Sequence, residues 1–141
     1  MSTLTGIDAN RAAVSESYAE LRGSLPATSD LMSFAASQQI AVQRLATSYC
    51  REIVSSATRC NEFFGQCQID GNAKDQVATV LYNKLIGADL TNQPGREGVT
   101  TEVVRMIDDL GCAGGCNDAD AETVLSATCT AVLSSSAVTI N

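Results

Sequence analysis

Residues 29–57, SDLMSFAASQQIAVQRLATSYCREIVSSA, decide the fold of this chain. No Gly or Pro interrupts this stretch, and Ser29 and Asp30 offer a cap and negative charge at its start. Its apolar spacing is helical on two sides, because one stripe comprises Leu31, Phe34, Gln38, Val42, Leu45, Tyr49 and Ile53, and a second comprises Ala36, Ile40, Thr47, Cys50 and Val54. A helix that is apolar on two sides is packed by neighbours on both flanks, so we predict a long central helix here.

The stretches on either side of this helix also carry helical periodicity. A first helix is expected from about Asp8 to Gly23, with Val14, Tyr18 and Leu21 inward. A short helical continuation holds Cys60, Phe63 and Phe64 and is stopped by Gly65.

Three more helices are expected downstream. The third runs over about 73–86 with Val77, Val80, Leu81 and Leu85 inward. A loop over 92–98 separates it from the fourth, which Thr100 or Thr101 caps and Gly111 ends. The fourth helix turns Val103, Val104, Ile107 and Leu110 inward. The last begins near Asn117 or Asp118 and carries Val124, Leu125, Cys129 and Val132.

These elements predict one all-α domain over residues 1–141, a compact bundle of about five helices. No run alternates with the period of a strand, and 141 residues suffice to bury a core. Residues 1–7 and 134–141 are expected to be frayed tails. Aromatic residues are only 4% of the chain, so Leu, Ile, Val and Ala must build most of the core.

Composition excludes several functions. The absence of His removes Ser-His-Asp and Cys-His nucleophile systems and His metal ligands. The net charge of −7 argues against nucleic acid and against anionic membrane surfaces as partners. No apolar run approaches the length of a membrane span. We expect no catalytic residues and no cofactor, and the sequence assigns no ligand-binding residue.

Six cysteines, an even number, favour three disulfides and an oxidising compartment. Cys50 and Cys129 lie on the apolar faces of the second and last helices, so a bridge between them would clamp distant parts of the chain. The other four lie in or beside loops, where Cys60 with Cys67, and Cys112 with Cys116, would close local loops. This is one of 15 possible connectivities, and we expect each bridge to add roughly 2–4 kcal/mol to the free energy of unfolding.

Two metal sites compete with these interpretations. Zinc held by Cys60, Cys67, Cys112 and Cys116 is one, although only the Cys112-x-x-x-Cys116 spacing is typical of structural zinc. Calcium at Asp118, Asp120 and Glu122 is the other, but further ligands and a turn glycine are missing from that pattern. We expect neither metal, and interpret the three acids as side chains that face a helix dipole.

The first residues, Met1 to Gly6, have neither a basic nor an apolar region typical of a signal peptide. Disulfides nevertheless need export. We therefore expect an extracellular, periplasmic or cell-surface module, expressed as a piece of a longer exported protein. No Asn-x-Ser/Thr sequon occurs, which favours a bacterial source over a eukaryotic glycoprotein.

Two patches of sequence carry a family resemblance. They comprise Leu25-Pro26, Asp30-Leu31, Phe34, Ser37-Gln38, Leu45-Ala46 and Tyr49-Cys50, together with Cys129 to Leu133. They resemble a helical module of large exported bacterial proteins that also carry laminin-G-like jelly-roll domains. The resemblance covers about a third of the chain and implies a non-catalytic surface or envelope module in which Cys50 and Cys129 are the natural pair.

The functional hypothesis is therefore a structural, assembly or adhesion module of a bacterial exported protein, which meets a protein partner or a second copy of itself. One alternative is a binding module that holds a small molecule or protein between its helices. Another is an enzyme that relies on carboxylates. An apolar exposed patch would favour assembly, an enclosed pocket would favour binding, and a buried carboxylate would favour catalysis.

Overall fold

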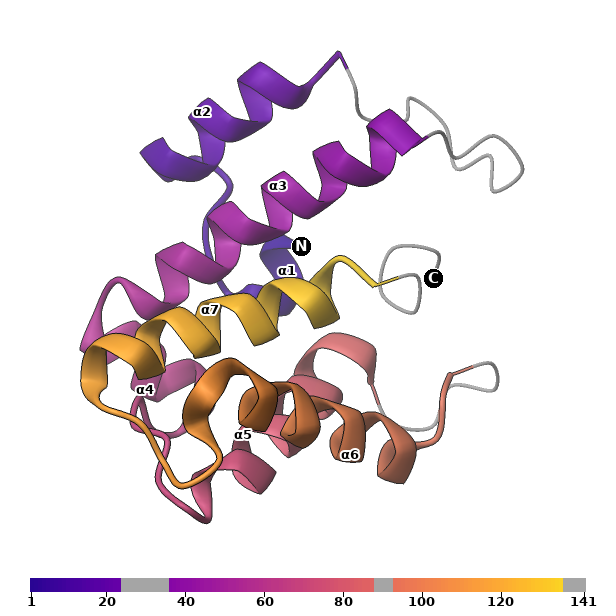
Figure 1. Ribbon diagram of the computed structural model, residues 1–141. Helices are drawn as coiled ribbons and strands as arrows, with labels where there is room; N and C mark the ends of the chain where they lie inside the picture. The colour runs from indigo at the N-terminus through magenta and orange to yellow at the C-terminus, as the bar shows by residue number, and fades with distance from the viewer. Residues whose placement is uncertain (24–35, 88–92, 136–141) are drawn as a thin grey trace.

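The computed structural model describes residues 1–23, 36–87 and 93–135 (Figure 1). Within these ranges the chain is helical and forms no strand, which confirms the all-α prediction. It contains more helices than the five expected. In chain order they are α1 (Ser2–Thr5), α2 (Ala12–Leu21), α3 (Ala36–Val54), α4 (Ala57–Phe64), α5 (Ala73–Leu81) with the π-helical turn η1 (Tyr82–Ile86), α6 (Arg96–Ile107) with the π-helical turn η2 (Asp108–Cys112), and α7 (Asp118–Leu133).

Helix α3 is central, as its two apolar stripes predict. It packs against α7 on one side and α2 on the other, and also contacts α1 and α4 (Figure 1). Ala46 and Cys50 are fully buried where α3 meets its neighbours. The expected first turns of this helix, with Ser29, Asp30, Leu31 and Phe34, lie outside the described residues.

Several apolar positions are more exposed than their periodicity predicts. Ile40 on α3 is 55% exposed and Tyr18 on α2 is 50% exposed. Leu45, Val80 and Val104, which the periodicity also places inward, are only partly buried against the core. Helical spacing shows which residues share a face, but not how far a neighbouring helix covers that face.

A break between α3 and α4 ends the long helix at Val54 rather than at about Ala57. Ser56 takes an extended conformation, with φ −138° and ψ 126°. The Arg59 side chain spans the break, because its Nε donates to the Glu52 carbonyl at 2.9 Å and its guanidinium to the Ser55 hydroxyl at 2.8 Å. Past the break, Cys60, Phe63 and Phe64 are buried as expected, and Gly65 ends α4 with φ 83°.

The N-terminal region differs from expectation in two ways. Asp8 does not cap a helix; it caps a turn, accepting from the Asn10 backbone N–H at 2.8 Å, and α2 begins only at Ala12. Residues 1–7 do not form the expected frayed tail. They contain the short helix α1, in which Thr5 is buried and its hydroxyl donates to the Met1 carbonyl at 3.0 Å, and Ile7 joins the core.

Helix α6 begins earlier than predicted. Gly95 is its N-cap, so residues 96–99 belong to the helix and neither Thr100 nor Thr101 caps it. Val103 and Ile107 are buried as expected, whereas Leu110 lies in η2 and is 46% exposed. At the far end of the chain, α7 begins at Asp118 with Asn117 as N-cap, and Val124, Leu125, Cys129 and Val132 are all buried. Ser134 and Ser135 follow α7, while 136–141 lie outside the described residues.

Candidate functional site

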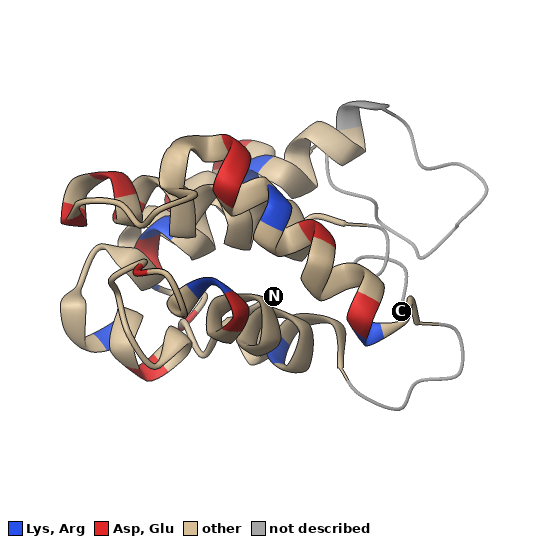
Figure 2. Ribbon diagram, turned by 60° about the horizontal axis from the view of Figure 1, so that its bottom comes forward, with Lys and Arg blue, Asp and Glu red and all other residues tan. Residues whose placement is uncertain are grey.

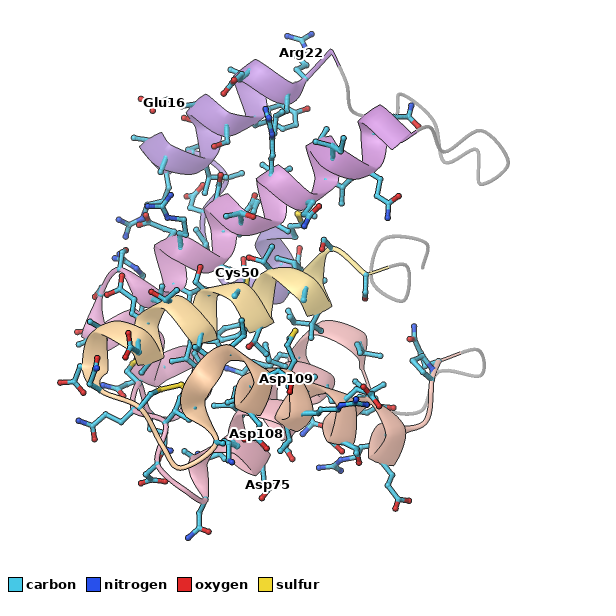
Figure 3. The ribbon with its side chains drawn as sticks, viewed as in Figure 1. Glu16, Arg22, Cys50, Asp75, Asp108 and Asp109 are labelled. Atoms are coloured by element: carbon cyan, nitrogen blue, oxygen red, sulfur yellow. A yellow bond between two sulfur atoms is a disulfide. The ribbon has the colours of Figure 1, made fainter. Side chains whose placement is uncertain are left out.

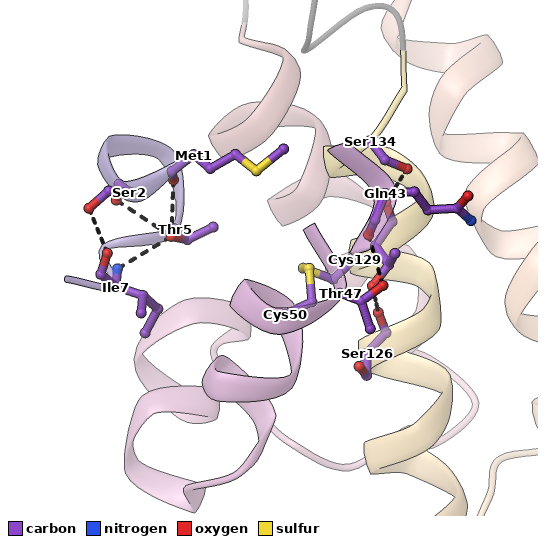
Figure 4. Close-up of a disulfide and its surroundings, with 11 residues drawn as sticks. Met1, Ser2, Thr5, Ile7, Gln43, Thr47, Cys50, Ser126, Cys129 and Ser134 are labelled. Carbon is purple, nitrogen blue, oxygen red and sulfur yellow. Dashed lines mark hydrogen bonds between the residues drawn. A yellow bond between two sulfur atoms is a disulfide. The ribbon is translucent and has the colours of Figure 1, made fainter. Parts of the chain in front are cut away.

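The disulfide between Cys50 and Cys129 joins the two helices at the centre of the fold. It links α3 to α7 across 79 residues of sequence, with the Cα atoms 5.8 Å apart, and both cysteines are fully buried (Figure 4). The hydroxyls nearby are used within their own helices, since Thr47 donates to the Gln43 carbonyl at 2.9 Å. This cross-link therefore serves the core and leaves no reactive thiol at its surface.

The second disulfide, Cys60–Cys67, ties α4 to the loop that follows it. The two Cα atoms are 5.7 Å apart, and the cysteines are seven positions apart in the sequence. Cys60 belongs to the buried core, and Cys67 packs partly buried against it. The bridge holds the loop close to the end of α4.

The third disulfide, Cys112–Cys116, closes the glycine-rich loop between η2 and α7, with Cα atoms 4.9 Å apart. The backbone N–H of Cys116 donates to the Ile69 carbonyl at 3.0 Å, so this loop pairs with the loop that Cys67 anchors. Gly115 permits the approach: its φ is +96°, and a Cβ there would lie 3.0 Å from the Ile69 oxygen. The two local disulfides thus hold two loops that lie side by side.

Lys74 adds an electrostatic link at the same end of the molecule. Its Nζ lies 2.5 Å from Asp108 Oδ1, near the junction of α6 and η2, and donates to the Ala113 carbonyl at 2.8 Å. Asp108 is labelled in Figure 3. The Lys74 side chain is only 12% exposed, so the pair is better shielded from solvent than a surface ion pair.

The structure contains the connectivity that the sequence favoured, and none of the described cysteines is free. The four cysteines of the rival zinc site form two of the three disulfides. Asp118 and Asp120 occupy the first turn of α7, where Asn117 accepts from the Asp120 backbone N–H at 3.0 Å. Across the described ranges, no group of three or more His, Cys, Asp or Glu side chains is placed to hold a metal ion.

Charged residues of both signs are spread over several helices (Figure 2). Several bases are committed to internal partners. Arg11 and Arg59 both pair with Glu52 at 3.2 Å, and Lys84 donates to the Phe63 carbonyl at 2.7 Å while lying over the Phe63 ring. Arg11, Arg59 and Lys84 all lie near α1, and each has a partner within the chain.

One titratable group is clearly perturbed. Burial raises the pKa of the Tyr49 hydroxyl above its ordinary value, a hydrogen bond with the Ser2 side chain opposes the rise, and the negative charge of Asp8 adds to it. Tyr49 is 5% exposed and belongs to the core. The perturbation therefore bears on stability at alkaline pH and does not mark a reactive group.

Two of the hollows in the described surface have linings that mix polar and apolar side chains. One, of about 590 Å³, lies beside Cys60 and Cys67 and includes the exposed carboxylates of Asp70, Asp118 and Glu122. Another, of about 560 Å³, follows the seam between α3 and α7, where hydroxyl and amide side chains line it together with Arg51, Glu122 and the apolar side chains of Val54, Ala127 and Ala131. The carboxylates of the first hollow are exposed and therefore well solvated.

A third hollow is mainly apolar. It is an open groove of about 670 Å³ between the first half of α6 and the C-terminal end of α7, and we call it the α6–α7 groove. Its apolar side chains are those of Ile86, Pro94, Val99, Val103, Met106 and Val132. The sequence did not reveal this groove, because Gly95 to Gly98 was interpreted as loop. The signal that could have pointed to it is the pair Gly95 and Gly98, whose lack of side chains leaves the α6 side of the groove open.

No family model, curated protein or solved structure matches this chain. No helix in the described part of the chain is long and apolar enough to cross a membrane.

Proposed function

We propose that this chain is a non-catalytic, disulfide-stabilised helical module of a bacterial exported protein, and that it acts in assembly or adhesion. The observation that carries the proposal is the use of all six cysteines as cross-links. One cross-link runs through the core, and each of the other two closes a local loop. Such cross-links persist only in oxidising compartments, which supports an extracellular, periplasmic or cell-surface location. The resemblance to helical modules of large exported bacterial proteins supports the same role.

The chemistry of the surface also favours a non-catalytic role. The carboxylates beside Cys60 and Cys67 are exposed, and the seam between α3 and α7 offers hydroxyls that bond within their own helices, as Thr130 does to the Ser126 carbonyl at 2.7 Å.

The test compares two preparations of the same chain, one secreted into an oxidising compartment and one kept in a reducing cytosol. We expect the secreted chain to have no titratable thiol, to melt at a higher temperature and to self-associate as its concentration rises in sedimentation velocity. A cytosolic chain that keeps six free thiols and melts at the same temperature would overturn the assignment to an exported module. A strictly monomeric chain with no affinity for any surface would overturn the assembly role.

The α6–α7 groove favours a second candidate function, that of a binding module. Apolar hollows of 300–1,000 Å³ are typical of ligand sites, and the volume of this open groove, about 670 Å³, falls within that range. Measurements in solution separate the two candidate functions. A binding module stays monomeric, and a ligand titrated into it changes the NMR signals of Val99 and Val132, which line the groove.

A further inference from the structure

The α6–α7 groove presents apolar side chains that the described chain leaves partly open to solvent. Pro94 is exposed and Val99 and Met106 are half-buried, while Val103 and Val132 lie buried beneath them at 5% and 7% exposed. Apolar surface that gathers in one hollow, instead of being scattered singly, marks an interaction site. An occupant of this groove must therefore bring apolar side chains.

Gly95 and Gly98 leave the α6 side of the groove without side chains at the start of the helix. A Cβ added to either residue would meet no atom within 4 Å, so open space lies directly over the backbone of the first helical turn. Neither glycine has the positive φ that would itself explain its presence. Because these two residues have no side chain, a polypeptide can approach the backbone of α6 closely. Small residues permit the same close approach at other helix contacts.

The rim of the groove is acidic. Glu102 is the charged residue that lines it; this side chain is exposed, and none of the ion pairs between described residues includes it. The chain as a whole carries a net charge of −7, so its field attracts cations over a longer range. Opposite charge at the rim of an apolar patch favours encounter and orientation of a partner.

We propose that the α6–α7 groove docks a segment of a partner protein that combines apolar side chains with a lysine or arginine. The apolar side chains lie between Met106 and Val132, and the basic group pairs with Glu102. The inference deepens the assembly role proposed above by naming the class of partner. It does not depend on the oxidising location, because the groove contains no cysteine.

The experiment titrates the full, oxidised chain with blocked pentapeptides and follows the backbone amide signals by NMR. The probe is acetyl-Leu-Val-Lys-Leu-Val-amide, and its matched control carries Glu in place of Lys. We expect shifts confined to residues around Gly98, Met106 and Val132, with the Lys peptide binding about two- to fivefold more tightly than the Glu peptide, the range of one exposed ion pair. The variant Glu102→Gln is expected to remove this preference.

A second pair of variants tests the place of binding. Gly98→Phe puts a ring into the open space of the groove and is expected to weaken the Lys peptide at least tenfold, whereas the matched control Gly98→Ala keeps its affinity. Unchanged helical circular dichroism shows that both variants fold. No binding of the Lys peptide, or binding that Gly98→Phe leaves unchanged, overturns the proposal.

Two further outcomes would assign the groove to another occupant and so also overturn the proposal. Binding that appears only after residues 136–141 are removed would assign it to that segment of this chain. Self-association that Gly98→Phe abolishes would assign it to a second copy. Self-association that persists while the peptides fail to bind rejects the partner class alone and leaves the assembly role standing.

Discussion

Loss of the Cys50–Cys129 disulfide is predicted to cost more stability than loss of either local disulfide. The double variant Cys50→Ala/Cys129→Ala opens a loop of 79 residues. The chain-entropy relation gives about 4.5 kcal/mol for a loop of that length, as it would for any cross-link of that span. A typical domain has only about 5–15 kcal/mol of total stability, so this variant is close to unfolding.

The matched comparison is Cys112→Ala/Cys116→Ala, which removes a cross-link across four residues. The same relation gives about 2 kcal/mol for this loop. The variant therefore also loses a disulfide and two sulfur atoms but should remain folded. The difference between the two losses, about 2–3 kcal/mol, isolates the effect of loop length.

The assay is urea unfolding of the parent chain and both variants at one temperature, followed by circular dichroism. Free energies extrapolated to zero urea are compared instead of midpoints, because a longer unfolded loop exposes more surface and steepens the transition. Should the first variant unfold without urea, adding a protecting osmolyte restores a measurable transition. Equal losses in the two variants, or a larger loss for the four-residue loop, would refute the reasoning.

Three further predictions concern single residues. Thr128→Val should raise the free energy of unfolding by about 1–2 kcal/mol in urea, because the Thr128 hydroxyl is buried with no hydrogen-bond partner among the described residues; a loss of stability would show that the hydroxyl is bonded. Gly98→Ala should add about 0.5–1 kcal/mol by favouring the helical state of α6, and a lower melting temperature would contradict this. Burial raises the pKa of Tyr49, so the folded chain keeps this proton where the unfolded chain releases it, and stability should fall as pH rises above about 10. Tyr49→Phe should flatten that alkaline loss, and an unchanged slope between the two proteins would show that Tyr49 is not its source.

The helices and much of the core could be predicted from the sequence because burial follows helical periodicity. In α7, all four residues expected inward are buried, and Asn117 caps the helix with its own side chain. The disulfide connectivity followed from similar reasoning. Cys50 and Cys129 each lie on the apolar face of a helix, whereas the other four cysteines lie in or near loops. These predictions depend on local patterns that the fold preserves.

The predictions that failed depend on distant neighbours. Ile40 and Leu110 have apolar spacing but remain exposed, because none of the helices in the described ranges covers them. The start of α6 was misplaced because Gly98 was interpreted as a loop residue. In the structure Gly98 lies within the helix, and burial of Val103 and Ile107 further along offsets the low helix propensity of glycine. Propensity is a weak prior that packing overrides.

The groove could not be predicted from the sequence for a related reason. Its two sides come from α6 and α7, and its floor joins Val103 to Val132 across the bundle. Each residue alone is an ordinary core or surface residue. Only the crossing of the two helices, with Gly95 and Gly98 on the open side, creates the hollow.

The most direct test of the central claim is a measurement of intact mass and of non-reduced peptides from the chain isolated under oxidising conditions. The account predicts a mass six hydrogens below that of the reduced chain, because all six cysteines are paired. It also predicts cross-linked peptides that join Cys50 to Cys129, Cys60 to Cys67 and Cys112 to Cys116. Alkylated thiols, a different connectivity, or a mass raised by bound zinc would contradict it.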